Sequence, residues 1–177
     1  MAGQRSILFS ASMALAVLAG YKTQTRRVVT GEVCPYGLPG DRLLGREGWR
    51  TVAEADALPP RELTPAHRVW YEADGLDQAG AGRYRPGMFM PRWASRISLV
   101  VVQVRVERLQ DISEADAIAE GIERYPNNPG RFLSKHRPGL NYPSARAAYA
   151  DLWDSINGPG SWATHPLVWA ITFERAP

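Results

Sequence analysis

Residues 96–109, RISLVVVQVRVERL, constrain the fold of this chain more than any other segment. Their β-branched composition predicts one long strand. Apolar residues occupy positions 97, 99 and 101, and then positions 102, 104 and 106, so the alternation changes phase. A phase change within a strand indicates a bulge or bend that turns the strand from one packing face to another. Such a strand is typical of a closed or partly closed barrel.

Shorter patterns place the other elements along the chain. Strands are expected at 6–11, 42–49, 68–74 and 166–174, and helices at 12–20, 112–122 and 144–156. Ser12 and Ser113 are the expected N-caps of the first two helices, and Gly20 and Gly121 end them. Turn-rich surface loops are expected at 50–67, 75–87 and 123–143. Because strands and helices do not alternate regularly, the predicted class is α+β, a mixed β-barrel with helices at its ends.

Length and composition narrow the class of protein. The chain has 177 residues, which suggests one domain, and its one cysteine, Cys34, excludes an internal disulfide framework. The histidines His67, His136 and His165 lie far apart without metal-ligand spacing, so no metal or other cofactor is expected. No apolar run reaches the roughly 18 residues of a membrane span. We therefore expect a cytoplasmic protein without membrane contact, and the oligomeric state stays open.

The basic residues are almost all arginines. The net charge of +3 and the pI of about 9.2 permit a nucleic-acid partner without requiring one. Only Lys22 and Lys135 are lysines, whereas all other basic side chains are arginines. A partly buried lysine can release its proton, which arginine cannot do in a protein. Lys22 is therefore a candidate base, with chance use of lysine in an arginine-rich chain as the alternative.

Lys22 belongs to the segment AGYKTQTRRVV at 19–29, in which Thr25, Arg26 and Arg27 follow it. A threonine hydroxyl becomes a nucleophile when a base takes its proton, and lysine serves as that base when burial or neighbouring cations lower its pKa. The two side chains meet only if the chain turns between them, because an extended strand places them on opposite faces. The alternative is a solvated lysine followed by a strand threonine.

Several motifs together resemble the ASCH domain of the PUA-like superfamily, in the form carried by phages and prophages. They are ILFSA, KTQTRRV, YGLPGDRL, MPRWASRI, RLQDISEADA and WDSINGPGSW. The resemblance implies a PUA-like barrel formed by a single ASCH domain over 1–177, with insertions at about 50–90 and 123–143. The small bacterial N(4)-acetylcytidine amidohydrolases resemble only the core, roughly 6–49, 96–122 and the last strand.

The amidohydrolase resemblance implies a catalytic set. That family uses a lysine, a threonine three residues later and a glutamate on a helix, which correspond here to Lys22, Thr25 and Glu120. The implied reaction is hydrolysis of the acyl amide of an N(4)-acylated cytidine. Glu120 would orient the lysine, protonate the leaving nitrogen or activate water, and these roles stay open. As an ordinary solvated residue, Glu120 would lie unfavourably near the negative end of its helix.

Arginines and aromatic residues flank these motifs and are the expected contacts to a nucleic acid or substrate. They are Arg26, Arg27, Arg42, Arg46, Arg92, Trp49 and Trp93, with Tyr36, Trp70 and Tyr84 as further stacking surfaces. Arginines bind phosphates and aromatic rings stack on bases, as single-stranded or flipped nucleotides require, although most of these rings would ordinarily pack in the core. The expected partner is a modified nucleoside or single-stranded nucleic acid in a bacterial or phage-infected cell. A non-catalytic RNA or modified-DNA reader is the rival function, and a ribonuclease is a third.

Overall fold

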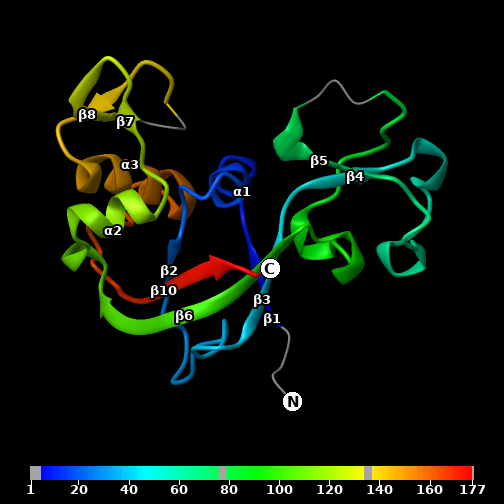
Figure 1. Cartoon of the computed structure of the whole chain (residues 1–177), viewed down its shortest axis with the longest axis horizontal. Helices are drawn as coiled ribbons and strands as arrows, with labels where there is room; N and C mark the ends of the chain where they lie inside the picture. Colours follow the sequence, from blue (N-terminus) through cyan, green and yellow to red (C-terminus); the bar gives the residue numbers. More distant parts are fainter. Residues whose placement is uncertain (1–4, 76–78, 134–136, 177) are drawn as a thin grey trace.

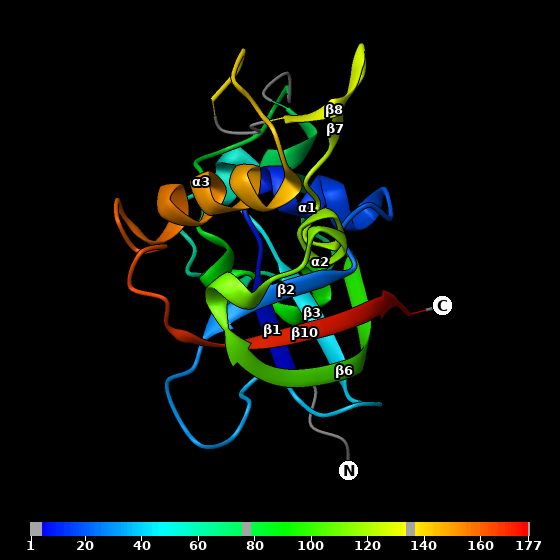
Figure 2. The same ribbon diagram turned by 90° about the vertical axis from the view of Figure 1, so that its left-hand side faces the viewer.

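A five-stranded mixed sheet forms the centre of the molecule. The computed structural model describes residues 5–75, 79–133 and 137–176. The sheet order is β1 (Arg5–Leu8), β3 (Arg42–Arg46), β6 (Ile97–Arg108), β10 (Leu167–Arg175) and β2 (Gln24–Val28). β1 and β3 run parallel, and the other neighbours run antiparallel. Figures 1 and 2 show β6 curving along this sheet beneath the helices. The α+β class is confirmed, but the order pairs β1 and β2 each on one side only, so the sheet does not close into a complete barrel.

The predicted irregularity of β6 is a bulge. Thr172 of β10 pairs with Gln103, but the next residue, Phe173, pairs with Val101, so Val102 is the extra residue. The bulge falls at the position where the apolar alternation changes phase. It lets the first half of β6 bury Leu99 and Val101 in the main core, while the second half carries polar side chains toward the helices.

The helices pack around two hydrophobic cores. The helices are α1 (Ala11–Leu18), α2 (Glu114–Ala119) and α3 (Ala145–Asn157), with a 3-10 turn, η6 (Leu109–Asp111), before α2. Ser113 caps α2 as predicted, whereas Ser10 rather than Ser12 caps α1. α1 packs on the main core beside Ile7 and Phe173, and α2 and α3 pack together around Trp153 in a second core.

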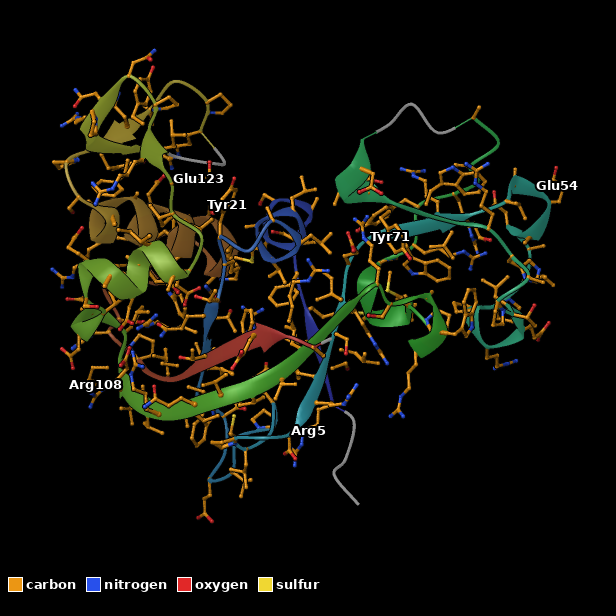
Figure 3. All side chains as sticks on the ribbon, in the orientation of Figure 1. Arg5, Tyr21, Glu54, Tyr71, Arg108 and Glu123 are labelled. Carbon is orange, nitrogen blue, oxygen red and sulfur yellow. The ribbon has the colours of Figure 1, made fainter. Side chains whose placement is uncertain are left out.

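Residues 49–94 form a separate lobe, here called the insertion lobe, on the far side of α1 from α2 and α3 (Figure 1). It contains β4 (Trp49–Thr51), β5 (Val69–Tyr71) and the 3-10 turns η1 (Ala53–Ala55), η2 (Pro60–Glu62), η3 (Glu72–Asp74), η4 (Gly87–Phe89) and η5 (Arg92–Ala94). Trp49 and Met90 lie in its own apolar core. Figure 3 labels Glu54 and Tyr71 within this lobe. The excursion expected at 50–67 is thus part of a folded unit with a core.

The prediction that residues 123–143 form an irregular loop is wrong. The segment contains β7 (Arg124–Tyr125), β8 (Asn128–Leu133) and β9 (Asn141–Tyr142), which pair antiparallel. Phe132 anchors the small sheet in the core formed by α2 and α3. Turn residues in and around these short strands masked their pattern in the sequence. Lys135 and His136 lie outside the described residues.

Candidate functional site

The chain brings Lys22 directly past the end of α2. After α1, the main-chain nitrogen of Lys22 donates to Ala16 O at 3.0 Å, and that of Thr23 donates to Ala119 O at 2.8 Å. Gly121 ends α2 with a φ of +97°, and a Cβ at this position would lie 3.3 Å from Lys22 Cβ. Glycine therefore provides both the left-handed turn and the space for the lysine stem.

Lys22 and Glu120 form a buried ion pair. Lys22 is 1% exposed, and its Nζ donates to Glu120 Oε2 at 2.6 Å, to Glu120 O at 2.9 Å and to Gln24 O at 2.8 Å. These contacts use all three ammonium protons. Burial lowers the pKa of Lys22, and the Glu120 carboxylate opposes this shift. The glutamate that lies unfavourably at a helix C-terminus thus has a cationic partner there.

Arg26 connects this ion pair to further charges. Its Nη1 donates to Glu120 Oε1 at 3.2 Å, its Nε donates to Glu107 at 2.8 Å, and its Nη2 contacts Asp116 at 3.1 Å. Arg105 bridges Glu107 and Asp116 at 2.8 Å and 2.6 Å. Together with Lys22, these residues form a network of three cations and three carboxylates, called the ion network below.

Thr25 lies on the other face of β2. In the pairing of β2 with β10, Arg26 is opposite Ala170 and Thr25 is opposite Ile171, which belongs to the main core. Thr25 is fully buried, and its Oγ1 has no hydrogen-bond partner among the described residues. Since β2 begins at Gln24, its extended backbone turns Thr25 away from the face that carries Arg26. The structure therefore joins Lys22 to Glu120 but does not bring Thr25 to them.

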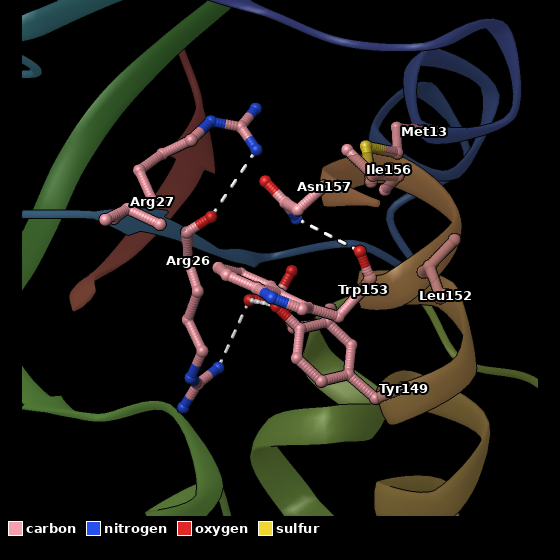
Figure 4. A pocket seen from close by; sticks show the side chains of 10 residues that line it. Met13, Arg26, Arg27, Tyr149, Leu152, Trp153, Ile156 and Asn157 are labelled. Carbon is pink, nitrogen blue, oxygen red and sulfur yellow. Dashed lines mark hydrogen bonds and ion pairs between the residues drawn. The ribbon is translucent and has the colours of Figure 1, made fainter. Parts of the chain in front are cut away.

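A cavity of about 50 Å³, called the chamber below, lies beside Glu120. Figure 4 shows Tyr149 and Trp153 of α3 next to Arg26 in its wall. It is lined by Met13, Arg26, Arg27, Val28, Glu120, Tyr149, Leu152, Trp153, Ile156 and Asn157. Tyr149 Oη donates to Glu120 Oε1 at 3.3 Å, and burial, followed by the Glu120 charge, raises the pKa of Tyr149 well above its usual value. Trp153 Nε1 is buried without a hydrogen-bond partner among the described residues. The chamber thus combines an acceptor, a free donor and two aromatic rings.

The chamber adjoins a much larger opening of about 830 Å³, called the groove below. Four residues line both spaces: Met13, Arg27, Ile156 and Asn157. The groove runs between α1, the end of α3 and the insertion lobe, which contributes Tyr84 and Met88. Its volume is within the range of about 300–1,000 Å³ that is usual for ligand sites. The chamber is therefore the narrow end of a space large enough for a small molecule.

The structure separates the expected binding residues into three groups. Arg27 and Arg46 line the groove, and Arg26 lines the chamber as part of the ion network. Arg42 is exposed on β3, and Arg92 and Trp93 lie on η5; none of these three lines the chamber or the groove. The stacking role expected for Trp49 is wrong, because the residue is fully buried in the core of the insertion lobe.

Sequence reasoning missed the aromatic wall of the chamber. Tyr149 and Trp153 are four residues apart on α3, so they lie on the same helix face. That spacing was a signal in the sequence, but it is equally typical of a helix face that packs on a core. Tyr36 and Tyr84, considered as stacking surfaces, both line the groove.

No described group of three or more His, Cys, Asp or Glu side chains is arranged to hold a metal ion. Among the described helices, none is both long and apolar enough to cross a bilayer.

Comparisons with known proteins gave two distant structural likenesses. No family model and no curated protein matches the chain. A protein from Enterococcus faecalis V583 with the family model DUF984 is 10% identical, with a TM-score of 0.45 over 99% of this chain and 81% of that one. An ASCH domain from Lactobacillus crispatus JV V101 is 11% identical, with a TM-score of 0.44 over 98% of this chain and 79% of that one. Likenesses at this level assign no function, which therefore rests on the side chains of the site.

Proposed function

We propose that this protein binds a nucleobase or nucleoside, with one edge of the base in the chamber and the rest in the groove. The observation that carries the proposal is the placement of Glu120, Tyr149 and Trp153 around the chamber, which adjoins the groove. A space of about 50 Å³ admits a ring edge or a small substituent and a water molecule rather than a whole nucleoside. The groove supplies the remaining volume.

The polar groups of the chamber match the edge of an amino base. Glu120 Oε1 accepts from Arg26 Nη1 at 3.2 Å and from Tyr149 Oη at 3.3 Å, and an exocyclic amine would replace the Tyr149 hydroxyl as the second donor. Trp153 Nε1 is a donor without a partner among the described residues, so a ring nitrogen or carbonyl of the ligand would satisfy it. Arg27, at the junction of chamber and groove, would face the sugar or phosphate.

The test is to titrate the protein with the four ribonucleosides and with short single-stranded oligonucleotides, using tryptophan fluorescence and calorimetry. Glu120→Gln should weaken binding about tenfold or more, because it removes a charge-assisted hydrogen bond of about 1.5–3 kcal/mol. Trp153→Phe keeps one aromatic ring and removes the Nε1 donor together with part of the indole volume, so it should weaken binding while the protein still folds. The exposed Glu54→Gln is the matched control. Absence of binding by every nucleoside and oligonucleotide would refute the proposal.

A second candidate function is hydrolysis of the acyl amide of N(4)-acylated cytidine. Two observations favour it: burial lowers the pKa of Lys22, and Glu120, its ion-pair partner, lines a chamber of a size suited to a small acyl group. Water would add to the acyl carbon and the C–N bond would break, giving a carboxylic acid and cytidine. Because Thr25 lies on the other face of β2, activation of water by Glu120 fits this geometry better than attack by Thr25.

Incubation with N(4)-acetylcytidine, followed by chromatography for cytidine, tests this second function. Glu120→Gln removes the carboxylate that would activate water at the chamber, so turnover should fall by about a hundredfold or more. Thr25→Val, which preserves shape, should leave turnover nearly unchanged if water is the nucleophile. Loss of turnover in Thr25→Val would instead identify Thr25 as the nucleophile, and absence of cytidine with the wild type would leave the protein a non-catalytic reader.

A further inference from the structure

A third hollow, called the lobe pocket below, lies on the insertion lobe. Its volume is about 320 Å³, and its walls are Pro60, Arg83, Tyr84, Arg85, Pro86 and Phe89. Tyr84 and Pro86 also line the groove. The groove in turn shares Arg27 and Asn157 with the chamber. The three hollows are therefore neighbours: the groove shares wall residues with the chamber on one side and with the lobe pocket on the other.

The lobe pocket has a cationic wall that the fold does not neutralise. Arg85 is 3% exposed, and among the described residues its side chain donates to the main-chain oxygens of Ala55, Asp56 and Leu58, while its guanidinium lies 5.6 Å from the centre of the Trp49 ring. Its Nε has no hydrogen-bond partner among the described residues, and none of their carboxylates forms an ion pair with it. The Asp56 carboxylate acts on Arg85 without forming an ion pair with it, so the charge of this buried guanidinium is balanced only in part and an incoming anion would be favourable there. The Arg83 side chain is exposed at the same pocket and forms no ion pair with a described carboxylate.

Exposed aromatic rings complete the lobe pocket. Phe89 is 55% exposed and Tyr84 is 49% exposed. Exposure of apolar ring surface to water is unfavourable, so a ligand that covers these rings would gain free energy. Stacking of bases on exposed rings beside arginines is how proteins hold single-stranded nucleic acid. Exposed rings and cations without a direct ion pair, in a hollow next to the groove, are not needed to bind one nucleoside.

We propose that the lobe pocket is a second nucleotide subsite, so the natural ligand is a single-stranded nucleic acid that runs from the chamber through the groove to the insertion lobe. The proposal rests on the proposed function, because the chamber would take one base of this strand. Phe89 and Tyr84 would stack on a second base, and Arg83 and Arg85 would bind a phosphate of the same strand. Positive charge at the lobe pocket complements a polyanion, which is why a nucleic acid is favoured over a neutral peptide.

The proposal is tested with cytidine and with single-stranded oligocytidylate and oligodeoxycytidylate from one to about eight nucleotides long. Affinity should rise steeply once the strand is long enough to reach the lobe pocket. Phe89→Ala should weaken binding of the long strands about tenfold and leave binding of cytidine unchanged. Arg83→Gln should weaken the long strands less, and it should reduce the salt dependence of their binding by about 0.7 in log–log slope, the value for one phosphate contact to a single strand.

Matched controls come from the same chain. Arg61→Gln removes an exposed cation from the insertion lobe but outside the pocket, and Leu38→Ala removes an exposed apolar side chain elsewhere. Both should bind all strands as the wild type does. If cytidine binds but affinity does not rise with length, or if Phe89→Ala and Arg83→Gln match their controls, the second subsite is wrong while the proposed function stands. If neither cytidine nor any strand binds, both are wrong. Tighter binding of oligocytidylate than of oligodeoxycytidylate would identify the natural strand as RNA, and the reverse would identify it as DNA.

Discussion

Removal of the Lys22 ammonium should destabilise the protein strongly, because the three buried oxygens that accept its protons would lose this donor. Lys22→Met keeps most of the side-chain volume but takes the donor away from Glu120 Oε2 and from the main-chain oxygens of Gln24 and Glu120. Loss of one partner from a buried ion pair costs about 3–5 kcal/mol. Arg26 still donates to Glu120 Oε1, so we expect the lower end, about 3 kcal/mol.

Urea unfolding measures this cost. Domains of this kind have a free energy of unfolding of about 5–15 kcal/mol, so the variant should still fold. With an m value of about 2 kcal/mol/M, a loss of 3 kcal/mol lowers the midpoint by about 1.5 M. The exposed Arg61→Met, which removes a cation from a surface side chain, should stay within about 0.5 kcal/mol of the wild type.

A double-mutant cycle separates the ion pair from general damage to the core. Lys22→Met with Glu120→Gln removes both charges, and Arg26 keeps its contacts with Glu107 and Asp116. The free energy of unfolding lost by the double variant should therefore be about 2 kcal/mol smaller than the sum of the losses of the two single variants. Additivity within about 0.5 kcal/mol, or a loss below about 1 kcal/mol for Lys22→Met, would refute the view that this pair organises the site.

Three further predictions concern the surroundings of the pair. Tyr149 should keep its proton at a pH at which free tyrosine ionises, because its pKa is raised in the folded protein. Its contribution to stability is therefore present below about pH 10 and falls above that pH, where the tyrosine of the unfolded chain ionises. At such a pH, Tyr149→Phe should reduce the difference in 295 nm absorbance between native and urea-unfolded protein by the signal of one tyrosine. Gly121→Ala should cost about 1 kcal/mol more than Gly20→Ala in urea unfolding, because both have positive φ but only the first meets Lys22 Cβ. Ser113→Ala should cost about 1 kcal/mol by removing the cap of α2, and a change under about 0.3 kcal/mol would contradict this.

The parts of the fold that the sequence predicted are those with strong local signals. The phase change in 96–109 located the bulge of β6 at Val102, and the serine before α2 located its cap at Ser113. Local patterns failed where tertiary contacts decide. Trp49 looks like any tryptophan near a turn, and only the folding of residues 49–94 around their own core buries it.

The candidate site shows the same limit at the scale of one residue. The resemblance placed Lys22 and Glu120 together, and their contact is present at 2.6 Å. For Thr25 the outcome depended on the register in which β2 pairs with β10, because a slip of one residue reverses the face of every side chain in the strand. The sequence between Lys22 and Arg26 has no signal for that register. Tyr149 and Trp153 come from a helix more than 120 positions away, so only the packing of α3 reveals their role.

The charges around the chamber indicate which part of a ligand can enter it. The ion network pairs Lys22, Arg26 and Arg105 with three carboxylates, so its cations are already neutralised. A phosphate in the chamber would meet the Glu120 carboxylate at low dielectric, where repulsion between like charges is strong. The uncharged edge of a base brings no such penalty, and its amine would find an acceptor there. Among the described residues, Arg27 and Arg46 donate to main-chain oxygens and pair with no carboxylate; Arg46 lies in the groove and Arg27 at its junction with the chamber. The division of charge therefore favours a base that enters edge first while its phosphate stays in the groove.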